Sequence, residues 1–222
     1  MHSHHYEAIV LKTYDVGEAD RFCILLTREA GRLAARARGV RKLTSRMGGA
    51  LLPFQHVQVE LKELGNEGWL VISARRNLSC VDHSRPTMSQ SIPLQILHAF
   101  SQVQQGSELL LKLLHSHQPL PDVFDATLQF LRLCHDGHRH LILGFTLHLL
   151  NVLGHLPESS NHVYFASCSQ EEKNFLMQAR EGRYEHFSKQ NSCPLHSTLQ
   201  AIADVLIADQ ISSPLRAGRV FF

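Results

Sequence analysis

The chain has 222 residues, of which 44% are hydrophobic and 19% are charged, the balance of a soluble globular protein with one large domain or two modest ones. The net charge is only +2, but residues 1–80 carry 12 basic against 8 acidic side chains, whereas residues 81–222 carry 10 against 12. The excess of positive charge therefore lies in the N-terminal part of the chain, residues 1–80.

The sequence has no feature of secretion or membrane insertion. The start, MHSHHYEAIV, lacks the basic stretch and long apolar run of a signal peptide. The most apolar segment, residues 141–153, is too short to span a bilayer and contains His148 and Asn151. Five widely spaced cysteines argue against a disulfide framework, so we expect reduced thiols and a cytoplasmic protein.

The first third of the chain has the pattern of short strands. Runs rich in β-forming residues at 8–13 and 21–27 are separated by the turn-like sequence of residues 15–18. Apolar and polar residues alternate at 57–62, and a further run follows at 69–74. Together with a basic strand, these runs predict a small five-stranded antiparallel barrel, because closure removes exposed edges, and we favour an OB-type barrel.

The basic strand lies in the most highly charged stretch, residues 27–54, which holds seven basic side chains and one acid. At the strand period of two, three arginines point one way while Leu33, Ala35 and Ala37 point toward a core. The glycines and basic residues that follow predict an exposed, flexible loop. We expect phosphate contacts from Arg32, Arg36, Arg38, Arg41, Lys42 and Arg46, and then from Lys12, Arg21, Arg75 and Arg76. Charge alone leaves a merely solvated face equally open.

The apolar period changes to three and four after residue 91, which predicts helices. We expect the first helix to begin near Ser91, with Pro93 in its first turn, and a second to begin at Ser107. Further helices are expected over residues 122–134, 139–153 and 198–209, with a polar and less regular stretch at 159–191. The predicted fold class is therefore α+β, with an N-terminal OB-fold barrel over residues 1–80 and a C-terminal α-helical domain over residues 81–222.

Four segments carry a resemblance to a known family: EAIVLKTYDVGEADRFCILLTREAGRL (7–33), ARGVRK (37–42), SRMGGALLPF (45–54) and FTLHLLNVLGHLP (145–157). In order and spacing they resemble the RecO family of bacterial recombination mediators. The resemblance covers residues 6–157 well and the last helix weakly.

The resemblance implies a non-enzymatic protein that binds single- and double-stranded DNA and anneals complementary strands in the bacterial cytoplasm, at the nucleoid. Such proteins act with RecR, and in some bacteria RecF, to load RecA onto DNA covered by single-strand-binding protein (SSB), whose acidic C-terminal tail they contact. We expect the tail to bind in the mostly helical region 94–153, where the basic residues are Lys112, Arg132 and Arg139.

One departure from the family concerns zinc. Many members carry a four-cysteine site after the motif that matches residues 153–157, whereas this chain offers only Cys168 and the distant Cys193 there. A scattered site would need His155, His162 and His196 as well, and tetrahedral zinc normally takes closely spaced ligand pairs. We therefore expect no metal and no other cofactor.

No catalytic motif accompanies these features, because the sequence has no P-loop, GxGxxG or GxSxG pattern, and we expect no enzyme. The His-rich residues 135–140 are expected to form a surface turn. Tyr14, Phe54 and Trp69 are candidates for stacking on DNA bases, although Trp69 is expected to pack inside. The alternative to a DNA-binding mediator is a non-catalytic OB-fold module that binds a protein and has weak affinity for DNA.

Overall fold

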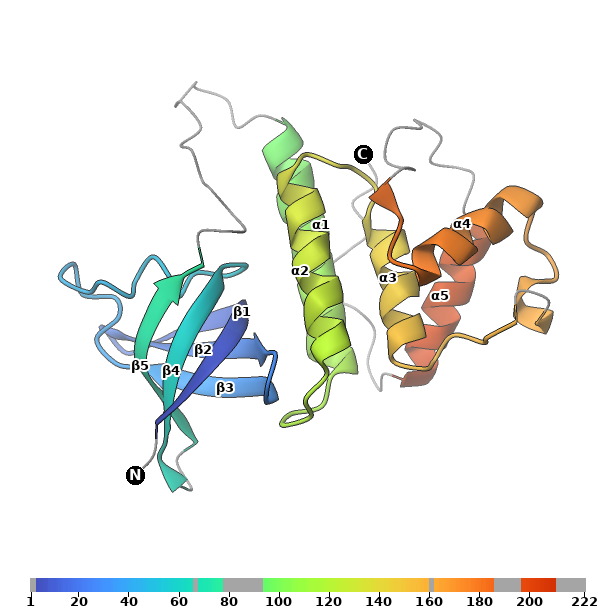
Figure 1. The fold of residues 1–222 in the computed structure, drawn as a ribbon. Coiled ribbons are helices and arrows are strands. Elements are labelled where there is room, and N and C mark those ends of the chain that lie inside the picture. Colours follow the sequence, from blue (N-terminus) through green and yellow to red (C-terminus); the bar gives the residue numbers. More distant parts are fainter. Residues whose placement is uncertain (1–2, 66–67, 78–93, 160–161, 186–196, 211–222) are drawn as a thin grey trace. The chain divides into compact units, whose positions relative to one another are not determined.

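The computed structural model describes residues 3–65, 68–77, 94–159, 162–185 and 197–210 (Figure 1). Its strands are β1 (Ser3–Val16), β2 (Asp20–Thr27), β3 (Gly31–Ala37), β4 (His56–Glu63) and β5 (Trp69–Arg76). Its helices are α1 (Leu94–Leu113), α2 (Pro121–His135), α3 (Ile142–Val152), α4 (Gln170–Arg180) and α5 (Ser197–Gln210), with a 3-10 turn, η2, at Val163–Phe165.

The five strands close into a barrel in the order β1-β2-β3-β5-β4. All neighbours are antiparallel except β3 and β5, and β1 closes the barrel by pairing with both β2 and β4. Alternate residues of every strand fill the core, among them Val10, Leu25 and Leu33, each at most 1% exposed. The predicted OB-fold barrel is confirmed, with β1 beginning five residues earlier than the sequence pattern indicates.

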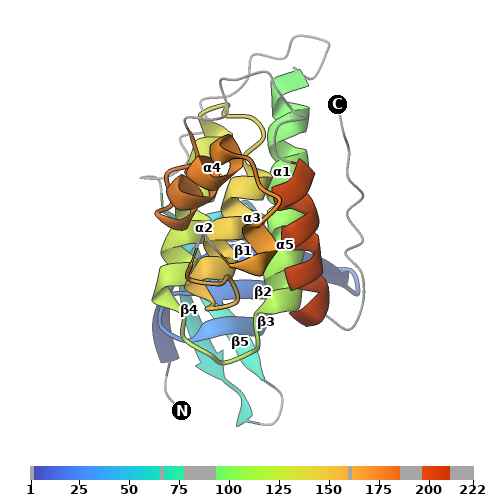
Figure 2. The same ribbon diagram turned by 90° about the vertical axis from the view of Figure 1, so that its right-hand side faces the viewer.

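Helix α3 is the centre of the helical part, where it contacts α1, α4 and α5 (Figure 2). It is mostly apolar, and Phe145, Leu147 and Leu149 are fully buried. The ring of Phe130 in α2 stacks on Phe145 at 4.2 Å between centroids. None of the helices within the described ranges is both long and apolar enough to cross a membrane.

Two predictions about the helices are wrong. The residues around Ser107 continue α1 instead of opening a new helix, because Gly106 lets the helix pack closely: a Cβ there would lie 2.7 Å from the Phe130 ring. Helix α4 lies within the stretch expected to be less regular. Its start is fixed by a capping box in which the Ser169 and Glu172 side chains each bind the other's backbone N–H.

The chain folds into two compact units, each of which is discontinuous in sequence. The barrel unit includes the segment Leu114–Phe124, here called the connecting segment, which joins α1 to α2 and contains the first turn of α2. The His117 N–H donates to the Arg32 carbonyl at 3.1 Å, and a Cβ on Gly31 would lie 1.9 Å from the Gln118 carbonyl oxygen. The domain boundary predicted near residue 80 lies outside the described residues.

Candidate nucleic-acid interface

Strand β3 presents a basic face, as its sequence period predicts. Leu33, Ala35 and Ala37 are at most 1% exposed and belong to the barrel core, while Arg32 and Arg36 point outward. Arg38, directly after the end of the strand, is exposed as well.

Residues 38–55, here called the basic loop, join β3 to β4. Their turns are closed by backbone hydrogen bonds, including Ser45 N–H to the Lys42 carbonyl at 2.9 Å. Val40 and Leu51 are buried in the barrel core, and the Leu51 carbonyl accepts a hydrogen bond from Arg21 Nη1 at 3.1 Å. We expected an exposed and flexible loop. Its charged side chains are exposed, but hydrogen bonds and buried residues hold its backbone in place.

The turn between β1 and β2, residues 15–20, is acidic and fastens the basic loop. Asp20 accepts the Gly39 N–H at 2.8 Å and pairs with Arg36 at 2.7 Å. These interactions, the Gly39 bond first, hold the pKa of Asp20 below its ordinary value. Asp15 pairs with Arg41 at 3.3 Å, and Arg41 Nη1 also donates to the Gly17 carbonyl. Two arginines of the predicted DNA surface are thus partly neutralised within the protein.

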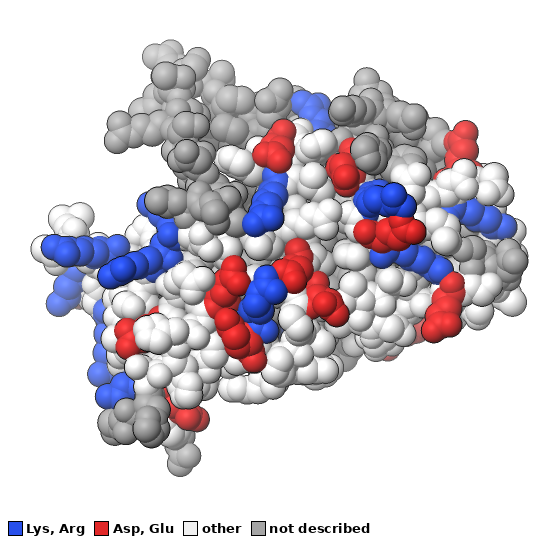
Figure 3. Space-filling view, viewed as in Figure 1, with Lys and Arg blue, Asp and Glu red and all other residues white. Residues whose placement is uncertain are grey.

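Other cations of the basic loop remain open to solvent. Arg38, Lys42 and Arg46 are exposed and form no ion pair within the part of the chain that the structure describes. Arg75 and Arg76 are exposed at the end of β5, and Arg76 lies against the loop, since a Cβ on Gly49 would be 3.1 Å from its guanidinium. Figure 3 shows Lys and Arg side chains gathered over this edge of the barrel, at the left of the view.

The remaining predicted DNA contacts lie apart from these five. Arg21 is 16% exposed and pairs with Asp15 at 3.1 Å, so it supports the loop from beneath. Arg32 stands at the other end of β3, where its Nη2 donates to Ser116 Oγ at 3.1 Å. Lys12 is exposed on β1, with its ammonium 5.1 Å from the centre of the Tyr14 ring.

The structure also separates the three aromatic candidates. Trp69 is partly buried and packs against the barrel core beside Tyr6. Phe54 is partly buried and has a left-handed backbone with φ 69°. Tyr14 is 47% exposed and is the best placed of the three to meet a ligand.

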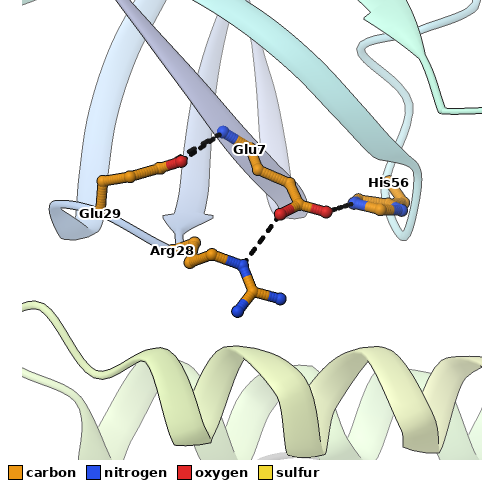
Figure 4. A network of polar contacts seen from close by, with 4 residues as sticks. All are labelled: Glu7, Arg28, Glu29 and His56. Carbon is orange, nitrogen blue, oxygen red and sulfur yellow. Dashed lines mark hydrogen bonds and ion pairs between the residues drawn. The ribbon is translucent and has the colours of Figure 1, made fainter.

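A polar network that sequence reasoning missed lies where the connecting segment meets the barrel (Figure 4). The Glu7 carboxylate binds Arg28 Nε at 2.9 Å and His56 Nε2 at 2.8 Å. The Arg28 guanidinium lies 4.8 Å from the Phe124 ring centre, and the His56 ring meets the same phenylalanine edge-on. Arg28 therefore contributes to the packing of the fold itself. Glu7 and His56 are 49 residues apart, so no local sequence pattern predicts their pairing.

The basic residues predicted to bind the SSB tail lie on different elements. Lys112 is in the last turn of α1 and pairs with Glu108 at 3.7 Å. Arg132 is in the last turn of α2, and Arg139 is exposed in the turn before α3, where the His-rich residues 135–140 also lie.

The three cysteines within the described ranges, Cys23, Cys134 and Cys168, are buried thiols. Burial raises the pKa of Cys23 to about 11 and that of Cys134 to about 12, and it also raises the pKa of Cys168. No group of three or more metal-ligating side chains occurs in the described ranges. Cys193 and His196, named for a scattered zinc site, lie outside those ranges.

Comparison with known proteins agrees with this architecture. Residues 1–74 match the family model for the recombination protein O N terminal part, and residues 95–210 match the model for the C terminal part. Proteins named DNA repair protein RecO are similar to the chain. The one from Nocardioides sp. is 58% identical over 57 residues, 26% of this chain and 23% of its own length.

Two other relatives match longer stretches. The Heliobacterium modesticaldum protein is 35% identical over 155 residues, 69% of this chain and 52% of its own length. The Bacillus pumilus protein is 29% identical over 180 residues, 80% of this chain and 65% of its own length. In each case the chain covers less than two thirds of the relative. Because the two family models together match most of the described barrel and helices, the chain belongs to the RecO family.

Proposed function

We propose that this protein is a DNA-repair and recombination mediator that binds single- and double-stranded DNA and anneals complementary strands. The observation that carries the proposal is the group of five exposed cations around the basic loop: Arg38, Lys42, Arg46, Arg75 and Arg76. The names of the relatives, DNA repair protein RecO, support the same function.

Phosphate contacts of this kind suit annealing. They neutralise the repulsion between two strands and leave the base edges free to pair. Arg36 and Arg41 already share their charge with Asp20 and Asp15, so we assign them to holding the loop and the five open cations to the phosphates. The proposed function needs no cofactor and no catalytic step.

The same proposal includes partners. The protein acts on nucleoid DNA in the bacterial cytoplasm and, with RecR and in some bacteria RecF, helps RecA to replace SSB. The acidic SSB tail binds the helical unit, with Arg132 and Arg139 as the exposed basic residues available to it and Lys112 as a third. Fluorescence anisotropy of a labelled tail peptide tests this, since Arg132→Ala with Arg139→Ala is expected to weaken binding of the peptide while annealing is retained.

Strand annealing of fluorescent oligonucleotides over a salt series tests the DNA function. With five phosphates neutralised, the log-log salt slope for single strands is expected near −3.5, roughly −0.7 per contact. Replacing Arg38, Lys42 and Arg46 by Ala should slow annealing and bring the slope to roughly −1.4.

The charge-matched control replaces Arg132, Arg139 and Lys173 of the helical unit by Ala and should keep the wild-type slope. If both triple variants had the same log-log salt slope, the DNA surface would lie elsewhere on the protein. No annealing by the wild type would favour the protein-binding module instead.

A further inference from the structure

The outer surface of β1, β2 and β3 carries a row of large side chains. The strand register pairs Tyr14 with Phe22, and Phe22 with Arg36. Directly paired residues of antiparallel strands lie on the same face of a sheet, so these three side chains are neighbours. Their chain neighbours Cys23 and Ala35 are 0% exposed in the core, which places the row outside the barrel.

This row is open to solvent and bordered by cations. Tyr14 is 47% exposed and the Arg36 side chain is 50% exposed, with Phe22 half-buried between them. Lys12 holds its ammonium 5.1 Å from the Tyr14 ring centre at one end. At the other end Arg38 follows Arg36 into the basic loop.

The nearest acid offsets part of the charge of Arg36, but it forms no ion pair with Lys12 or Arg38 in the described part of the chain. Asp20 is the nearest carboxylate in the register, and its oxygens are taken up by the Gly39 N–H and by Arg36. The other aromatic cluster of the barrel, Tyr6 with Trp69, has a different setting: burial, Glu29 and Glu63 raise the pKa of Tyr6, which marks acidic surroundings unsuited to phosphates.

We propose that Tyr14 and Phe22 form a stacking platform for the bases of single-stranded nucleic acid, with the strand running from Lys12 across the platform to the basic loop. The inference rests on the proposed DNA binding and deepens it. Ring stacking accepts any base and needs bases that are not already stacked in a duplex. Phosphate contacts do not distinguish a single strand from a duplex. We therefore assign the preference of this surface for single strands to the platform.

The test is the affinity for a mixed-sequence single strand and for a duplex of the same length, measured with Tyr14→Leu, Phe22→Leu and the double variant. Leucine keeps an apolar side chain at each position and removes the ring. Each ring is expected to cost the single strand about tenfold in affinity, within the roughly 5- to 150-fold range of base–aromatic stacking. Duplex affinity and the salt slope should stay unchanged, since no charge is altered.

Two controls accompany these variants. Tyr14→Phe keeps the ring and should keep the affinity. Tyr164→Leu removes a ring of similar exposure, 44%, from η2 and should have no effect. Photo-crosslinking of an iodouracil-substituted strand to the wild type, mapped by mass spectrometry, gives an independent readout, with adducts expected at Tyr14 or Phe22.

The possible results separate this inference from the proposed function. Unchanged affinity in the double variant, or an equal loss for single strand and duplex, would overturn the platform while leaving the basic loop as the DNA site. Adducts confined to other residues would also overturn it. A wild type that binds no nucleic acid would remove both proposals together.

Discussion

At the scale of single residues, Gly31 fastens the connecting segment to the barrel. Its backbone has φ 69°, and a Cβ would lie 1.9 Å from the Gln118 carbonyl oxygen. Gly31→Ala is expected to lower the free energy of unfolding by about 2–4 kcal/mol, from left-handed strain and displacement of the segment. Urea denaturation measures this.

The matched control for that change is Gly17→Ala. Gly17 has φ 59° but nothing within 4 Å of a Cβ, so only the left-handed strain of about 1–2 kcal/mol applies. Equal losses for both variants would show that the connecting segment does not press on Gly31.

Asp20 makes the stability of the protein depend on pH in the acidic range. Its pKa lies below the ordinary 3.8 because it accepts the Gly39 N–H and pairs with Arg36. A depressed pKa contributes stability above the unfolded value, and this contribution is lost as pH falls through the folded value. Asp20→Asn should therefore have a lower free energy of unfolding than the wild type at pH 6, measured by urea denaturation. The difference should shrink as the pH falls below about 4.

Glu18→Gln supplies the comparison for Asp20, because it removes one acid from the same turn. Glu18 is exposed and forms no hydrogen bond to the basic loop in the described part of the chain. If both substitutions changed stability alike, the clamp on the basic loop would not be the cause.

At the scale of elements, the start of α4 depends on its capping box. Ser169 Oγ accepts the Glu172 N–H at 3.2 Å, and Glu172 accepts the Ser169 N–H at 2.9 Å. Ser169→Ala should cost about 1 kcal/mol in the free energy of unfolding, measured by thermal or urea denaturation. Ser167→Ala, two residues earlier and exposed, is the control and should be neutral.

The sequence predicts elements well where their signal is local. The alternation of Arg32, Leu33 and Ala35 is enough to place β3 and its basic face. The spacing of Ser169 and Glu172 is also a local signal for the start of a helix, but the polar residues around it hide the helix that follows. The helix start predicted at Ser107 is wrong, and the close packing of the preceding Gly106 in α1 depends on Phe130, a residue far along the chain.

The candidate site was harder to predict than the strands. Its basic residues are visible in the sequence, but their pairing is not: Asp20 binds Arg36 across a hairpin, and Glu7 joins Arg28 to His56 across the barrel. Phe22 was missed because only the register of β1, β2 and β3 sets it beside Tyr14 and Arg36.

At the scale of the whole molecule, two cysteines report on the two units separately. Cys23 lies in the barrel core and Cys134 in α2, at 0% and 2% exposure, and burial raises both pKa values, to about 11 and about 12. A thiol-specific reagent attacks the thiolate, so in the native protein at pH 8 both should react only through unfolding. Mass-spectrometric labelling over a urea series measures the opening of each unit.

Serine at Cys80, Cys168 and Cys193 leaves only these two reporters. Rapid labelling of Cys23 or Cys134 without urea would contradict the buried packing, and an exposed engineered cysteine at Ser167 provides the rate for an accessible thiol.

The discontinuous barrel unit has a consequence for protein synthesis. Its last strand ends at Arg76, but the piece that covers Gly31 and stacks on Arg28 ends only at Phe124. At about 5–20 residues per second, the ribosome needs a few seconds more to make that piece. During that interval the nascent barrel lacks the residues that cover Gly31 and the Arg28 guanidinium in the finished protein.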